Sequence, residues 1–283
     1  MNQIICKSLS VFFLILSNYA LAQIKGVCID ENGKAIPYVN ISIIGKKIGT
    51  VSNQKGEFTL DSKKIFNTDR LLFSHLNFKS LEALVPKITK KIILLEKNEL
   101  LEEVVLLKRK KKVKRQEIGT IKKRKMVTLY SFSKGLGNEI GKLIKVKKNR
   151  EYELLECKIQ VAKLDFENVT IRINFYKVGL NNQIDKLPYN SNNIIAKVDK
   201  EGNISIPLKE YYLFIDFNFL VSIEWIDFEL KENKKEKNLI EYASNLYNGP
   251  LFYRQNKNVK WEEQKLKYNI GLGISLVTNI YIK

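Results

Sequence analysis

Three carboxylates around a tryptophan are the first candidates for acid–base chemistry in this chain. Glu224, Asp227 and Glu229 lie in the segment FLVSIEWIDFEL, which also contains Trp225. Glycoside hydrolysis needs two carboxyl groups that face each other across a cleft. The segment alternates as a strand does, so Glu224 and Trp225 point to opposite faces. A solvated strand face accounts for these acids, while a catalytic pair formed by residues distant in sequence stays open.

The other common catalytic arrangements depend on His75, the only histidine of the chain. A Ser-His-Asp triad would need His75 as its base, but Ser74 is its direct neighbour on a strand and points to the other face. No Gly-x-Ser-x-Gly turn is present, and one histidine without paired cysteines does not match a zinc site. We therefore expect no catalytic residue, no metal site and no cofactor.

Aromatic side chains interleaved with Asn and Lys in the last third of the chain suggest a binding site. The candidate ligand-binding residues are Tyr253, Arg254 and Trp261. Exposed aromatic faces with polar neighbours can hold sugars, and Arg254 could orient an anionic ligand or stack on an aromatic ring. The alternative is ordinary packing in the core and rim of a β-sandwich.

Basic residues are concentrated in the segment 108–125, KRKKKVKRQEIGTIKKRK. It has eleven basic residues and one acidic residue, so its net charge of +10 is about half of the chain's +19. A block of like charge tends to stay extended and solvated, which predicts a linker. The segment could also hold an anionic surface, where each basic residue contributes about 1 kcal/mol. The candidate contact residues are Lys108, Arg109, Lys110, Lys111, Lys112, Lys114 and Arg115.

The N-terminus has the pattern of a secretory signal peptide over residues 1–22. Lys7 precedes the apolar run LSVFFLIL, and Ala20-Leu21-Ala22 is a small-x-small cleavage site. The alternative is an N-terminal membrane anchor. We expect an exported protein that is periplasmic, outer-membrane associated or secreted, without a transmembrane segment in the mature chain. Export and the lack of aromatics in the basic segment argue against a nucleic-acid partner.

Short strands and frequent turns fill residues 23–107. Asn32-Gly33 and Gly56 mark two turns between alternating strands. Strands this short predict a β-sandwich and not a βαβ sheet. Cys28 here and Cys157 further along the chain both lie in apolar-alternating strands, so we expect buried, inert thiols.

A set of residues follows a recognisable order and spacing over residues 23–107. These residues are Gly26, Val27, Asp30, Gly33, Ile36, Pro37, Val39, Ile41, Gly49, Thr50, Gly56, Phe58, Leu60, Phe73, Ser74 and Phe78. With this pattern, the stretch resembles the carboxypeptidase regulatory-like domain of bacterial cell-envelope proteins. Asn77 precedes Phe78 where the family usually has Gly before an aromatic residue, and Asn tolerates the left-handed conformation. The resemblance implies a transthyretin-like sandwich of seven strands, and such domains are usually non-catalytic accessories.

Alternating apolar segments continue over residues 126–283. In VTIRINFYKV (169–178), one face carries Val, Ile, Ile and Phe, and the other carries Thr, Arg, Asn and Tyr. That pattern predicts a strand with an apolar inner face and a polar outer face. No convincing helix follows, so we predict a second, larger, jelly-roll-like sandwich and an all-β chain.

These observations predict an exported, non-catalytic binding or accessory protein of the bacterial cell envelope. Its partner would be an envelope protein, a glycan or an anionic lipid surface. Two alternatives stay open. The chain could be a secreted hydrolase acting on glycan or peptide, or a purely structural envelope component.

Overall fold

The computed structural model describes residues 23–61, 64–88, 90–97, 112–120, 124–132, 135–232, 239–246, 249–265 and 270–282. The predicted signal peptide lies outside these ranges. Within them the chain is all-β with sandwich-like sheets, which confirms the predicted fold class. Helical structure in the described ranges is limited to the short 3-10 turns η2 (Val85–Lys87), η3 (Leu180–Asn182) and η4 (Lys209–Tyr211). No helix among these residues is long and apolar enough to cross a membrane.

Among the described residues of the first domain, seven strands form two sheets. The three-stranded sheet has the order β4-β1-β7, with β1 (Gln23–Ile29), β4 (Glu57–Asp61) and β7 (Lys91–Ile93). The four-stranded sheet has the order β3-β2-β5-β6, with β2 (Asn40–Ile43), β3 (Gly49–Val51), β5 (Arg70–His75) and β6 (Phe78–Leu84). Apolar side chains from both sheets, including buried Cys28, meet in one core.

The second domain packs two larger sheets against each other. The six-stranded sheet has the order β13-β12-β16-β10-β18-β19, with β10 (Glu139–Ile144), β12 (Phe166–Lys177), β13 (Ile194–Val198), β16 (Phe219–Leu230), β18 (Leu251–Arg254) and β19 (Glu262–Gln264). The eight-stranded sheet contains β8 (Lys112–Gly119), β9 (Arg124–Phe132), β11 (Arg150–Leu164), β14 (Gly202–Pro207), β15 (Phe214–Ile215), β17 (Leu239–Asn245), β20 (Gly271–Leu272) and β21 (Ile274–Ile282).

Alternation along β12 and β16 builds the core between these two sheets. Ile171, Ile173 and Phe175 of β12 point into it, as do Trp225 of β16 and Cys157 of β11. Each fully buried large apolar side chain contributes about 1.5–3 kcal/mol. The predicted inner face of residues 169–178 and the predicted opposition of Glu224 and Trp225 are therefore confirmed.

The prediction of a linker over 108–125 is wrong for part of its length. Lys112–Gly119 form β8, which pairs antiparallel with β21 at the edge of the eight-stranded sheet. An edge strand pairs its backbone on one side and leaves basic side chains in water, so like charge does not prevent it from forming. Lys114 and Arg115 are exposed in this way. The second domain thus includes residues from 112 on, and 108–111 lie outside the described residues.

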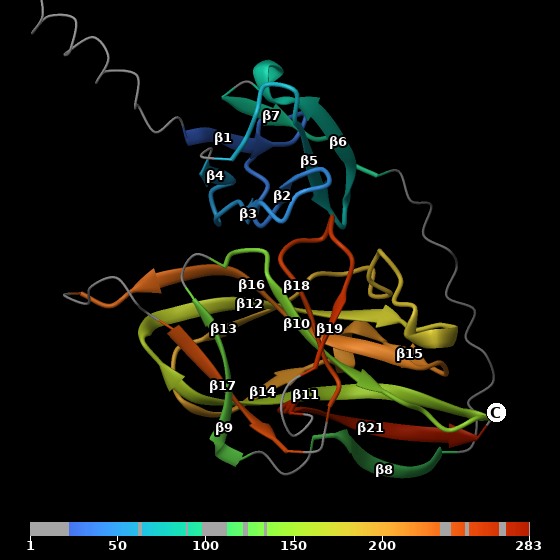
Figure 1. The fold of residues 1–283 in the computed structure, drawn as a ribbon. Helices are drawn as coiled ribbons and strands as arrows, with labels where there is room; N and C mark the ends of the chain where they lie inside the picture. Colours follow the sequence, from blue (N-terminus) through green and yellow to red (C-terminus); the bar gives the residue numbers. More distant parts are fainter. Residues whose placement is uncertain are drawn as a thin grey trace, which may run out of the picture.

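The first domain lies on the outer face of the six-stranded sheet, and the eight-stranded sheet lies on the opposite side of the six-stranded sheet (Figure 1). Asn256 joins the two domains, because its side-chain amide donates to the carbonyls of Lys46 and Ile48 at 3.2 and 3.4 Å. Gly49 makes room for this contact, since a Cβ there would lie 3.1 Å from the Cβ of Asn256. The first domain therefore covers part of the outer face of the six-stranded sheet.

Candidate functional site

Charged side chains on the outer face of the six-stranded sheet are buried beneath the first domain. Glu139 of β10 lies directly opposite Glu224 of β16 in the strand register. Each pairs with an arginine, Arg254 of β18 or Arg172 of β12, and all four side chains are at most 1% exposed. We call these side chains and their hydrogen-bond partners the interdomain network. They are fully desolvated ion pairs, which are stable only when both partners are present.

Glu224 is the centre of one half of the network. Nη1 of Arg172 lies 3.2 and 3.1 Å from its two carboxylate oxygens. Asn174 donates to Oε2 at 2.9 Å, and Nζ of Lys257 lies 3.2 Å from the same atom. Burial raises the pKa of the Glu224 carboxyl, but Arg172, Lys257 and the Asn174 hydrogen bond outweigh it and hold that pKa at about 2. Glu224 is thus a permanent anion near neutral pH.

Glu139 is the centre of the other half. Nη2 of Arg254 contacts Oε1 at 2.5 Å, while the hydroxyls of Tyr176 and Ser222 donate to Oε2 at 3.0 and 2.9 Å. The Arg254 guanidinium lies 4.8 Å from the ring centroid of Tyr176 and 4.4 Å from that of Trp261. Both oxygens of the Glu139 carboxylate therefore accept hydrogen bonds from side chains of the protein.

The first domain covers the interdomain network on the side that faces away from the core of the second domain. Nη2 of Arg172 donates to the carbonyl of Tyr38 at 2.7 Å, and Tyr38 holds the left-handed conformation with φ of 58°. A tyrosine in this region is strained and is retained where surrounding contacts require it. His75 of the first domain lies 3.2 Å from the side-chain amide of Asn193. Burial, with Arg172 and Lys257 nearby, lowers the pKa of His75 to about 3, so its ring is neutral.

A second polar site, a groove of about 400 Å³, lies on the outer face of the eight-stranded sheet. Strand register places Arg115 of β8, Asn279 of β21, Glu153 of β11 and Phe214 of β15 in one row across this face. The groove residues are Arg115, Glu153, Leu155, Glu156, Ser205, Pro207, Lys209 and Asn279.

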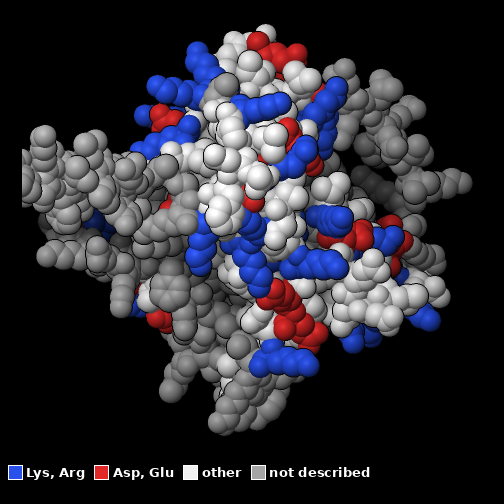
Figure 2. Space-filling model, turned by 45° about the horizontal axis from the view of Figure 1, so that its top comes forward, with Lys and Arg blue, Asp and Glu red and all other residues white. Residues whose placement is uncertain are grey.

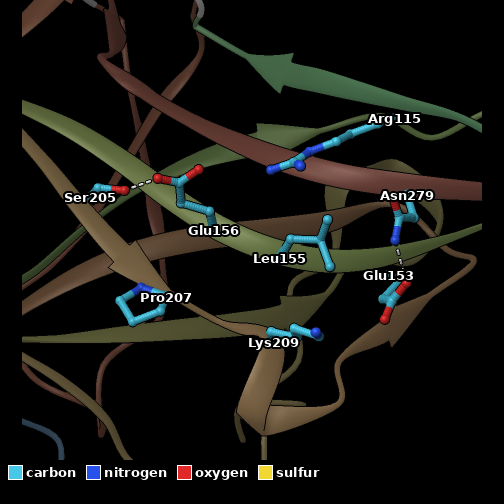
Figure 3. A pocket seen from close by; sticks show the side chains of 8 residues that line it. All are labelled: Arg115, Glu153, Leu155, Glu156, Ser205, Pro207, Lys209 and Asn279. Carbon is cyan, nitrogen blue, oxygen red and sulfur yellow. Dashed lines mark hydrogen bonds between the residues drawn. The ribbon is translucent and has the colours of Figure 1, made fainter.

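A register shift in β11 shapes the groove. Pairing of β11 with β21 shifts between Leu154 and Glu156, which leaves Leu155 in a β-bulge. Figure 3 shows Leu155 in the middle of the groove, with Arg115 and Lys209 on opposite sides of it. The side-chain amide of Asn279 donates to Glu153 at 2.8 Å. Unlike the interdomain network, this site is open and keeps charged groups at its surface.

Comparison with known proteins identifies the first domain. Residues 24–106 match the family model described as CarboxypepD_reg-like domain. These residues are a CarboxypepD_reg-like domain. The match confirms the resemblance, and a search of curated proteins found no match.

Solved structures similar to the chain are distant. One holds the cysteine protease and lectin-like domains of Cwp84, a surface layer associated protein of Clostridium difficile, at 13% identity and TM-score 0.36. It covers 54% of this chain, and this chain covers 36% of it. Another, infectious bursal disease virus of the Gt strain, has 9% identity, covers 87% and 62% of the two chains, and has a TM-score of 0.27. At these TM-scores neither structure decides the function.

The three predicted ligand-binding residues do not form one exposed platform. Arg254 and Trp261 lie together in the interdomain network beneath the CarboxypepD_reg-like domain, and Arg254 is 1% exposed. Tyr253 precedes Arg254 on β18 and so points to the other face of the sheet. Stacking on aromatic rings, the alternative role considered for Arg254, is the one that the structure shows.

The predicted anionic-surface residues are only partly described. Lys108–Lys111 lie outside the described residues, and Lys112 begins β8. Lys114 and Arg115 are exposed, and Arg115 also lines the groove. Figure 2 shows that basic side chains are spread over the CarboxypepD_reg-like domain and its boundary with the second domain, with fewer acidic ones among them. Positive charge is therefore not confined to the predicted segment.

Most residues of the two sites were missed by sequence reasoning. Arg172 and Glu224 were recognised as the polar face of two strands, but that face was expected to be solvated. It is buried because the CarboxypepD_reg-like domain covers it. A signal was present in β12, where Arg172 and Asn174 alternate with buried apolar residues in a strand that has a neighbour on each side. Residues of the groove come from four distant segments that no spacing connects.

Proposed function

We propose that this chain is an exported, non-catalytic binding protein of the bacterial cell envelope, with its ligand held in the groove of the eight-stranded sheet. The observation that carries the proposal is the contrast between the two polar sites. The interdomain network is sealed and internally satisfied, whereas the groove is open and displays charged side chains.

The buried carboxylates are poorly suited to hydrolysis, the main alternative. A general acid or base must exchange a proton near the working pH. Glu224 has a pKa of about 2 and stays ionised. Glu139 and Glu224 are both 0% exposed, so a substrate would reach them only after the first domain had moved away. Their arrangement supports a role in holding the two domains together.

The groove has the features of a binding site. Its volume of about 400 Å³ falls in the range of ligand pockets, roughly 300–1,000 Å³. It lies on strands of a packed sandwich, which hold side chains more precisely than loops do. A rigid polar groove on the face opposite the first domain can take a ligand without disturbing the domain contact.

Two features support a place in the cell envelope. Residues 1–22 have the pattern of a removable export signal, and the first domain is of a kind that resembles those of bacterial cell-envelope proteins. Exposed Lys114 and Arg115 on β8 add a weak contact with an anionic surface.

Binding and turnover on envelope material would test the proposal. The chain from Gln23 onward is incubated with isolated envelope fractions at low and at physiological salt. Retained protein and released fragments are then measured. We expect retention at both salt concentrations and no accumulation of products. Retention lost at physiological salt would assign the contact to the basic segment instead of the groove. Released products would overturn the non-catalytic assignment, and no retention at either salt would overturn binding itself.

A further inference from the structure

The groove of the eight-stranded sheet has a balanced charge. Among its lining side chains, Arg115 and Lys209 are cations, and Glu153 and Glu156 are anions. An anionic ligand would meet two carboxylates, and a cationic ligand would meet two basic side chains. This balance favours a ligand without net charge.

Hydrogen-bonding atoms of both kinds are available in the groove. Asn279 and Tyr281 both donate to Oε2 of Glu153, at 2.8 and 2.6 Å, which leaves Oε1 for a ligand. Arg115 and Lys209 bring N–H donors to the same groove. Acceptors and donors side by side match hydroxyl groups, each of which can donate and accept.

An aromatic edge flanks these polar atoms. Phe214 lies opposite Glu153 in the register of β11 and β15, so the two side chains are on the same face. Its side chain is 39% exposed, and its ring lies 6.5 Å from that of Tyr281. A pyranose ring has an apolar C–H face that packs on an aromatic surface and hydroxyls that reach polar groups beside it.

We infer that the groove binds a neutral saccharide, whose apolar ring face packs against Phe214 and whose hydroxyls reach Glu153, Arg115 and Lys209. The inference rests on the proposed function, because it names the ligand class of the same groove. An apolar ligand would cover the charged groups of Arg115 and Glu153 without offering them hydrogen bonds. An extended peptide pairs with the edge of a sheet, whereas the groove lies on the face of one.

Calorimetric titration with a panel of neutral and acidic oligosaccharides tests the inference. The wild-type mature chain is compared with Arg115→Ala and Phe214→Ala. Arg70→Ala and Phe66→Ala are matched controls, because Arg70 and Phe66 are exposed residues of the same types on the first domain, with 54% and 66% exposure. Circular dichroism confirms that each variant is folded. We expect at least one neutral oligosaccharide to bind, and we expect binding to weaken about tenfold or more in the groove variants only.

Two results would overturn the inference. One is no binding of any neutral saccharide up to about 1 mM. The other is equal affinity in wild type, Arg115→Ala and Phe214→Ala. The proposed function would survive either result if the same protein were still retained on envelope fractions at physiological salt. It would fail separately if that retention were absent or if fragments were released.

Discussion

Replacing Glu224 by Gln should destabilise the second domain while preserving the shape of the side chain. The change leaves Arg172 and Lys257 without their counter-charge, and Arg172 is 1% exposed and cannot be rehydrated. Breaking a buried ion pair costs about 3–5 kcal/mol. The pKa gives a similar size, since a fall from 4.5 to about 2 corresponds to about 3 kcal/mol at about 1.4 kcal/mol for each pKa unit. We expect the free energy of unfolding to fall by about 3 kcal/mol at pH 7.

The loss should shrink in acid. Because the pKa of Glu224 is lower in the folded chain than in the unfolded chain, its stabilising effect is complete above about pH 5. It is lost as the pH falls from about 4.5 towards 2. By pH 3 about 2 of the 3 kcal/mol are gone from the wild type. The difference between wild type and variant should therefore narrow to about 1 kcal/mol.

Urea unfolding followed by tryptophan fluorescence measures this difference. Both tryptophans, Trp225 and Trp261, belong to the second domain and report on its unfolding. Glu262→Gln is the control, because Glu262 pairs with Lys47 across the domains while its side chain is 46% exposed. Such a pair contributes at most about 1 kcal/mol. A loss no larger than that of Glu262→Gln, or the same loss at pH 7 and pH 3, would refute the reasoning.

Four further variants test the fold and the domain contact. Asn256→Ala removes two hydrogen bonds to backbone carbonyls of the first domain, and we expect about 1–3 kcal/mol less stability and faster amide exchange at that contact. Gly56→Ala should cost more than Gly33→Ala in thermal unfolding: both have positive φ, but only at Gly56 would the new Cβ lie 2.5 Å from a backbone oxygen. Burial lowers the pKa of Lys142 to about 8, so wild-type stability should rise between about pH 8 and 10.5, and Lys142→Met should lose that rise.

Periodicity predicted the strands well because the alternation of apolar residues along a strand shows which of its faces points into the core. The inner positions of β12 were read correctly from the alternation in residues 169–178. The same pattern says nothing about what lies on the outer face. Arg172 and Asn174 have the polarity of solvated residues, and only the docking of the first domain makes them buried. The polar groups of an outer strand face therefore have hydrogen-bond partners, but these partners can belong to another domain instead of water.

The local excess of basic residues led to a wrong prediction, because it does not show whether the segment pairs with a neighbouring strand. The basic residues of 112–119 argued against a strand, yet an edge strand needs only its backbone and one neighbour, here β21. The ion pairs could not be predicted from the sequence either, since Glu139 and Arg254 are 115 residues apart in sequence. Nothing in a local window connects two such residues until the order of the strands is known.

The two polar sites lie on opposite faces of the same sandwich. The interdomain network covers the outer face of the six-stranded sheet, and the groove lies on the outer face of the eight-stranded sheet. Stacked sheets are about 10 Å apart, and substitutions at that separation without shared partners have nearly additive effects. Glu224 can therefore hold the first domain in place without entering the chemistry of the groove. This separation lets one strongly charged sheet face serve assembly while the other remains free for a ligand.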